Sequence, residues 1–135
     1  MGRRNARKLA FYLLFQYDFV KDGNFDEIKE TFLTLNDEEI TENDKNYILS
    51  KTEGTMKNLE EIDDLIGKYA KGWSVERMSK VDKAILRLAT YEIKFAPDVP
   101  AVNEAVELAK TYSSDEAPAF INGILGKLTD SGENA

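Results

Sequence analysis

Apolar residues recur at spacings of three and four along almost the whole chain, and this pattern restricts the fold more than any other feature. The most regular stretch runs from Lys80 to Phe95. Its helical spacing places the apolar residues Val81, Ile85, Leu88 and Ala89 on one side, together with Glu92. These spacings mark one face of an α-helix, whereas the strict alternation typical of a strand never runs past a few residues. Only three prolines and eight glycines occur among 135 residues. The sequence therefore predicts an all-α fold.

The spacing and the capping signals together predict a compact bundle of about seven helices. The expected helices cover about 4–21, 26–35, a segment after Thr41, 58–69, 80–95, 104–112 and a segment after Asp115. Thr41 and Ser79 are each followed by an aspartate three residues later, which is the pattern of a helix N-cap. Asn103 and Asp115 are also expected to cap the helices that they precede, with Pro118 in the tolerated first turn.

Turn-forming residues interrupt the helical pattern at Asp22-Gly23, Asn36-Asp37, Gly72 and the loop between Pro97 and Pro100. A length of 135 residues falls within the usual size of one domain. We therefore expect a single domain over residues 1–135, with a disordered tail from about Thr129.

The chain contains neither cysteine nor histidine. These two residue types supply the commonest general base, the commonest metal ligands and every Ser-His or Cys-His nucleophile. A run of acids at Glu60, Glu61, Asp63 and Asp64 lacks the spacing of a calcium loop and is interpreted as a solvated face. The composition argues against most classes of enzyme, and we expect no catalytic residue, metal or other cofactor.

The longest apolar run, Leu9 to Val20, is interrupted by Gln16 and Asp18. It is shorter than the ~20 residues that span a bilayer, and it makes a poor signal-peptide core. We expect a core helix of a cytoplasmic protein that does not enter a membrane.

Charge is unevenly distributed along the chain. The net charge of −7 would normally count against nucleic-acid binding, because cations meeting phosphates supply most of that affinity. However, residues 18–64 hold fifteen acids against five lysines, and basic zones flank this block at 1–17 and 68–94. The first zone carries no acid and four cations: Arg3, Arg4, Arg7 and Lys8. Arginine in particular suits phosphates and base edges, so these four cations are candidate RNA contacts; the alternative is a disordered, soluble tail.

Several separated motifs resemble the NusB family, and together they cover nearly the whole chain. They are Arg3-Arg4-Asn5-Ala6-Arg7 before an aromatic helix, Trp73 and Arg77, Val81 to Ala89 with Tyr91-Glu92, Asp98-Val99-Pro100, Asn103 to Lys110, and Phe120 to Leu125. One departure is that only Ala101 and Val102 separate Pro100 from Asn103, where the family usually has several residues. The loop before the sixth helix is therefore expected to be shorter than in the family.

The resemblance implies a helical fold of two subdomains that share the first helix. It also implies an RNA-binding transcription factor that binds single-stranded, boxA-like nascent RNA together with NusE, a ribosomal small-subunit protein. The implied role is antitermination in ribosomal RNA operons, as part of the RNA polymerase elongation complex and without catalysis. Two alternatives stay open. One is the RNA-targeting module that precedes a methyltransferase domain in some RNA-modifying enzymes, and the other is a structural homodimer formed through the apolar first helix.

Aromatic side chains are candidates for stacking on RNA bases, since single-stranded RNA is bound by splayed bases on exposed rings. The resemblance implies that three rings lie near RNA, those of Phe15, Tyr112 and Phe120. Asn122 is expected to add hydrogen bonds to the same RNA beside Phe120. The alternative for each ring is a place in the core. Trp73 is interpreted as a packing residue at a hinge.

Lys80, Lys83 and Arg87 follow one another at helical spacing, so one helix face could extend the basic track. The alternative is paired surface charge, with Glu76 beside Lys80. Carboxylates do not help to bind phosphate directly, and we therefore expect Glu76 and Asp82 to contact base edges or a protein partner.

Overall fold

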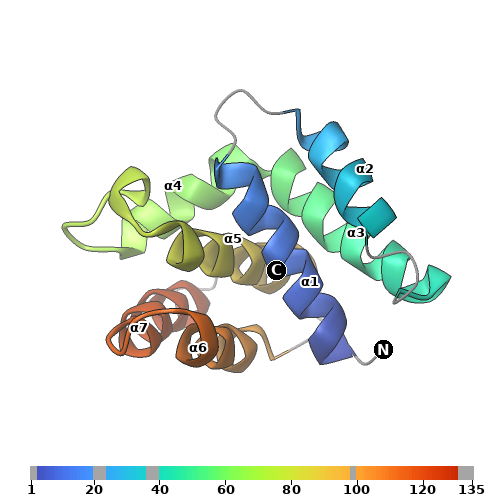
Figure 1. The fold of residues 1–135 in the computed structure, drawn as a ribbon. Coiled ribbons are helices and arrows are strands. Elements are labelled where there is room, and N and C mark those ends of the chain that lie inside the picture. Colours follow the sequence, from blue (N-terminus) through green and yellow to red (C-terminus); the bar gives the residue numbers. More distant parts are fainter. Residues whose placement is uncertain (1–2, 20–23, 36–39, 98–99, 131–135) are drawn as a thin grey trace.

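The computed structural model describes residues 3–19, 24–35, 40–97 and 100–130, and within these ranges it is helical without any strand. The α-helices are α1 (Arg3–Phe19), α2 (Phe25–Leu35), α3 (Glu42–Lys57), α4 (Leu59–Tyr69), α5 (Lys80–Phe95), α6 (Ala101–Tyr112) and α7 (Ala117–Asp130), and a short 3-10 helix, η2, spans Val75–Arg77 (Figure 1). The predicted all-α fold of about seven helices is confirmed. The predicted turns at 22–23 and 36–37 lie outside the described residues.

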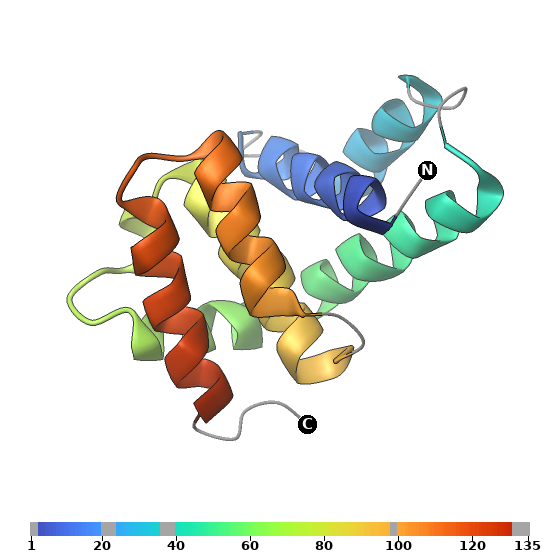
Figure 2. The same cartoon turned by 90° about the horizontal axis from the view of Figure 1, so that it is seen from below.

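α5 lies at the centre of the bundle and α1 crosses it (Figures 1 and 2). α1 packs against α2 and α3 on one side and against α5 on the other, while α4, α6 and α7 pack around α5. Ten of the sixteen residues of α5 are buried. α1 therefore joins a group formed with α2 and α3 to a second group built around α5, as the expected pair of subdomains requires.

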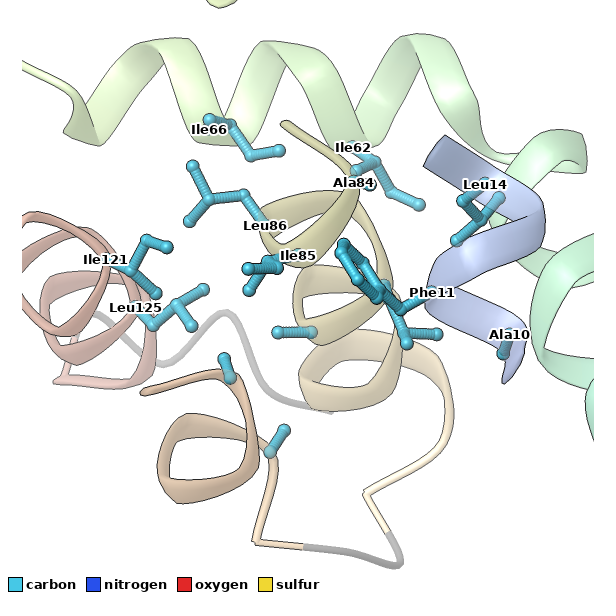
Figure 3. Close-up of a cluster of buried hydrophobic side chains, with 14 of the residues drawn as sticks. Ala10, Phe11, Leu14, Ile62, Ile66, Ala84, Ile85, Leu86, Ile121 and Leu125 are labelled. Carbon is cyan, nitrogen blue, oxygen red and sulfur yellow. The ribbon is translucent and has the colours of Figure 1, made fainter. Parts of the chain in front are cut away.

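The apolar core forms where α1, α4, α5 and α7 meet (Figure 3). It includes Phe11, Leu14, Ile62, Ile85, Leu86, Ile121 and Leu125, each no more than 2% exposed. Burying an aliphatic or phenyl side chain of this size contributes about 1.5–3 kcal/mol each. Gly54 of α3 marks another close approach, because a Cβ there would overlap the ring of Tyr91 on α5.

The capping predictions at Thr41 and Ser79 are confirmed. Thr41 Oγ1 accepts a hydrogen bond from the backbone N–H of Asp44 at 3.1 Å, and Ser79 Oγ accepts one from Asp82 at 3.1 Å. Gly72 has φ of +78°, which suits glycine, and it lies in the turn between the end of α4 and Trp73.

The predicted start of the sixth helix is wrong. α6 begins at Ala101 and not after an Asn103 cap, and the backbone N–H of Glu104 donates to the carbonyl of Pro100 at 3.0 Å. Proline has a torsion close to helical, so a helix can begin directly after it. α7 begins at Ala117, where the carbonyl of Glu116, rather than of Asp115, accepts from Phe120 at 3.3 Å. Pro118 lies in its first turn, as expected.

α7 extends through Asp130, and the tail beyond it lies outside the described residues. Among the helices that the structure describes, none is long and apolar enough to cross a membrane.

Candidate nucleic-acid interface

The N-terminal cations separate into different environments. Arg4 has a side chain that is 74% exposed, and its guanidinium lies beside Glu104 on α6. Lys8 is half-buried one turn further along α1. Arg3 is the first residue of α1, and its side chain is not among those described. A hollow of about 140 Å³ lies between α1 and α6. Its lining includes Arg4 and Lys8 of α1 and Tyr112 of α6.

Arg7 differs from its neighbours, because it is buried, with 5% of its surface exposed. Its Nε donates to Glu92 Oε2 at 3.1 Å and its Nη2 donates to the Tyr47 hydroxyl at 3.0 Å. Lys51 Nζ also lies 3.4 Å from Glu92. Burial raises the pKa of Glu92, although the charges of Arg7 and Lys51 oppose this rise. The geometry argues against the expected RNA contact by Arg7 and makes it a link between α1, α3 and α5.

A second cation cluster surrounds Asp18 near the end of α1. Its carboxylate accepts from Lys80 at 3.1 Å and lies 3.2 Å from Lys83 Nζ and 3.3 Å from Arg87 Nη1. Burial alone would raise the pKa of Asp18, but the lysine hydrogen bonds and the neighbouring cations hold the pKa below its ordinary value. Lys80 thus pairs with Asp18, and the pairing with Glu76 suggested by the sequence is replaced by this one.

Two members of the expected basic track are therefore interior residues. Lys83 and Arg87 are each 8% exposed, and Arg87 makes two further hydrogen bonds to Asp63 at 2.9 and 2.8 Å. The geometry argues against the predicted RNA contacts on this face by Lys83 and Arg87, because carboxylates already hold them. Lys80 differs, since 38% of its side chain is exposed.

One stripe of α1 stays partly exposed between these two cation groups. This α1 stripe, at spacings of four, three and four, consists of Lys8, Tyr12, Phe15 and Phe19. The rings of Phe15 and Phe19 pack edge to face with centroids 4.8 Å apart, and Lys80 Nζ lies 5.2 Å from the Phe19 ring. Phe19 is 57% exposed. The α1 stripe therefore has a cation at each end, its own Lys8 and Lys80 of α5, with aromatic rings between them.

Tyr112 joins the stripe from α6. Its hydroxyl accepts a hydrogen bond of 2.7 Å from the Tyr12 hydroxyl, and this bond raises the pKa of Tyr12 to about 12. The next residue, Ser113, donates to Asp82 Oδ1 at 2.6 Å, which ties the end of α6 to the first turn of α5. These contacts lead from the α1 stripe to Asp82.

Asp82 lines a hollow of about 210 Å³ together with two aromatic rings. Phe120 is half-buried and Trp73 is 56% exposed, and their rings meet edge to face at 6.0 Å. Arg77 and Glu116 add opposite charges to the lining. Glu76, which directly precedes Arg77, and Asn122, which follows Phe120 by two residues, are both exposed. We call this feature the Trp73 hollow.

The sequence interpretation missed the exposure of Trp73. Its ring was expected to pack at a hinge, yet more than half of its surface faces solvent. The signal lay in its position directly after Gly72, outside the apolar periodicity of α4. Among the described residues, no group of three or more acidic side chains is placed to hold a metal ion.

Comparison with known proteins agrees with this architecture. Residues 4–130 match the model of the NusB family. A transcription antitermination protein NusB from Acetivibrio thermocellus is 50% identical over 131 residues, covering 95% of this chain and 88% of that protein. A solved structure of T. maritima NusB superposes with a TM-score of 0.89 at 38% identity, covering 96% of this chain and 92% of that one.

A further solved structure contains RNA. It is a crystal structure of the antitermination factors NusB and NusE in complex with double-stranded RNA, and one of its chains matches with a TM-score of 0.84 at 25% identity. The match covers 96% of each chain. The likeness therefore extends over the elements that build the α1 stripe and the Trp73 hollow.

Proposed function

The chain belongs to the NusB family, and from this premise we propose that it is a transcription antitermination factor that binds RNA together with NusE. The observation that carries the proposal is the 50% identity to an antitermination protein over 95% of this chain. The resemblance implies that the factor acts on ribosomal RNA operons in the RNA polymerase elongation complex. A cytoplasmic location and the absence of catalysis follow from that role.

We propose that the RNA is single-stranded where it meets this chain, in the manner of boxA, although the related complex contains double-stranded RNA. The partly exposed rings support this choice. Unstacked bases pack on aromatic faces with about 1–3 kcal/mol per base, and such faces are accessible only to unpaired strands. Phe15, Tyr112 and Phe120 are each half-buried, so part of each side chain stays open to solvent.

Polar residues on the same path would supply the remaining contacts. Arg3, Arg4 and Lys8 would meet phosphates at one end of the α1 stripe, and Lys80 would meet them at the other. At the Trp73 hollow, Asn122 would add hydrogen bonds, while Glu76 and Asp82 would accept from base edges or from the protein partner. Arg7 and Lys83 would act indirectly, by holding α1 on α5.

The methyltransferase-module alternative has little support, because the Acetivibrio relative is a NusB protein of which this chain covers 88%. The homodimer alternative stays a prediction. Measuring the mass of the protein in solution with and without RNA separates it from RNA binding by a monomer.

The test is binding of a fluorescent boxA-like RNA and of a shuffled RNA of the same composition, with NusE present, across a salt series. We expect tighter binding of the boxA-like strand and an affinity that falls steeply with salt. Equal affinity for the two strands would overturn the proposed sequence-specific role.

A further inference from the structure

Glu104 of α6 pairs with Arg4, whose side chain is far more exposed than that of Arg7. Arg4 Nε lies 3.3 Å from Glu104 Oε2, and Arg4 Nη2 lies 3.3 Å from Oε1. Both carboxylate oxygens thus face one edge of the guanidinium. A carboxylate and a phosphate present similar pairs of oxygens to this planar fork. In the free protein, a carboxylate therefore occupies the edge of Arg4 that best suits a phosphate.

The two partners are anchored to very different degrees. The side chain of Glu104 is 15% exposed, whereas that of Arg4 is 74% exposed. Arg7 Nη1 lies 3.8 Å from the same Glu104 oxygen, and Arg7 is itself fixed by Glu92 and Tyr47. Glu104 also lies in the first turn of α6, where the helix dipole favours an acid. The carboxylate is thus the fixed partner, and Arg4 is the one exposed to an incoming strand.

Resting on the proposed function, we propose that Glu104 is a built-in competitor for RNA: a phosphate must displace its carboxylate from Arg4 before that arginine can bind the strand. The Glu104 carboxylate lowers the affinity of the N-terminal end of the interface for every strand. Its negative charge stays beside the bound phosphate, since Arg7 retains it. Exposed ion pairs are weak, so the competition is worth about a two- to fivefold difference in affinity.

The opposite role is that Glu104 orients Arg4, leaving the Nη1 side of the guanidinium to meet the phosphate. The two roles give opposite signs. If Glu104 competes, its neutralisation tightens RNA binding. If Glu104 orients Arg4, the same change weakens binding, because the arginine loses its fixed position.

Glu107 provides a matched control for charge alone. It lines the same hollow as Arg4 and Glu104, but it pairs with Lys110, whose Nζ lies 3.6 Å from Glu107 Oε1. Glu107→Gln removes one negative charge one helical turn away from Glu104. Any general effect of net charge on RNA affinity therefore appears in both Glu104→Gln and Glu107→Gln.

The experiment measures the affinity of the full chain for boxA-like RNA, with NusE present, in five forms: wild type, Glu104→Gln, Glu107→Gln, Arg4→Ala, and Arg4→Ala with Glu104→Gln. Circular dichroism checks that each variant keeps the helical content of the wild type. We expect Glu104→Gln to bind about two- to fivefold tighter, and Glu107→Gln to differ from wild type by less than that. In the Arg4→Ala background, Glu104→Gln should give no gain.

Weaker or unchanged binding by Glu104→Gln would overturn the competition, as would a gain that persists without Arg4 or that Glu107→Gln matches. Each of these results leaves the proposed function standing if the wild type binds RNA. A wild type that binds no RNA would instead overturn the proposed function, and the competition with it.

Discussion

Arg7 of α1 and Glu92 of α5 form a buried ion pair, with Nε 3.1 Å from Oε2 and side chains that are 6% and 1% exposed. Lys51 of α3 reaches the same carboxylate at 3.4 Å. One glutamate thus joins three helices that belong to both helical groups. Buried charges are tolerated only when they are paired, so the position of α1 on α5 depends on all three side chains being present.

Replacing Glu92 by alanine should lower the free energy of unfolding by about 3–5 kcal/mol, because two cations then remain buried without their carboxylate. Urea unfolding at neutral pH measures the change. Glu61→Ala is the control, since Glu61 is 53% exposed and makes a long ion pair with Lys94, at 3.7 Å. It should cost at most about 1 kcal/mol. Equal losses for the two variants would contradict the structural role of Glu92.

Arg4 and Arg7 should respond differently to alanine, although both belong to the same arginine motif. Arg4→Ala should leave the free energy of unfolding nearly unchanged and reduce the slope of log affinity against log salt by about 1. Arg7→Ala should instead cost about 3–5 kcal/mol of stability, because Glu92 loses its closest partner. RNA titrations at four salt concentrations, combined with urea unfolding, separate the two effects. An unaltered stability in Arg7→Ala would contradict the burial of this residue.

This difference between neighbours also explains which features could be predicted from the sequence. The caps at Thr41 and Ser79 depend on residues three positions away, so a local pattern reveals them. The partners of Arg7, Lys83 and Arg87 lie far along the chain, and only tertiary packing brings those carboxylates close. A basic residue at helical spacing is therefore visible in the sequence, whereas its availability to RNA is not. The exposure of Trp73 is likewise decided by tertiary packing, because the neighbour of its ring is Phe120 of α7.

Asp18 should make stability depend on acidity. Its pKa is lowered in the folded protein, so its ionised form stabilises the fold above its ordinary value of 3.8, and this contribution is lost as the pH falls through the lower folded pKa. Asp18→Asn should therefore be less stable than wild type at neutral pH, by about 1–3 kcal/mol. The difference between the two proteins should shrink below a pH of about 4. Urea unfolding at pH 7, 5, 4 and 3 checks this, and a difference that grows on acidification would refute the assignment.

Gly54 should tolerate no larger side chain. A Cβ at this position overlaps the Tyr91 ring, so Gly54→Ala must push α3 away from α5 and should cost about 1–3 kcal/mol. Gly126 of α7 is the matched control, because nothing lies within 4 Å of a Cβ built there. Gly126→Ala should stabilise the protein by about 0.5–1 kcal/mol through helix propensity. Thermal unfolding of both variants gives the two signs directly, and a stabilised Gly54→Ala would show that the helices are not in this close contact.

Trp73 offers a direct probe of the proposed RNA path, because it is the single tryptophan of the chain and is 56% exposed at the hollow that it shares with Phe120. A base stacked there should quench its fluorescence and shift the emission in proportion to the bound fraction.

Phe120→Ala should weaken RNA binding by about 1–3 kcal/mol, the value of one stacked base. It should also cost stability, since the ring is half-buried, and binding is therefore compared at temperatures where both proteins are folded. Phe95→Ala serves as the control, since Phe95 is a 39% exposed ring on α5 that stacks on Tyr91 and lies outside the lining of the Trp73 hollow. If RNA binds without changing the Trp73 emission, and Phe120→Ala binds as tightly as Phe95→Ala, the bases follow another surface.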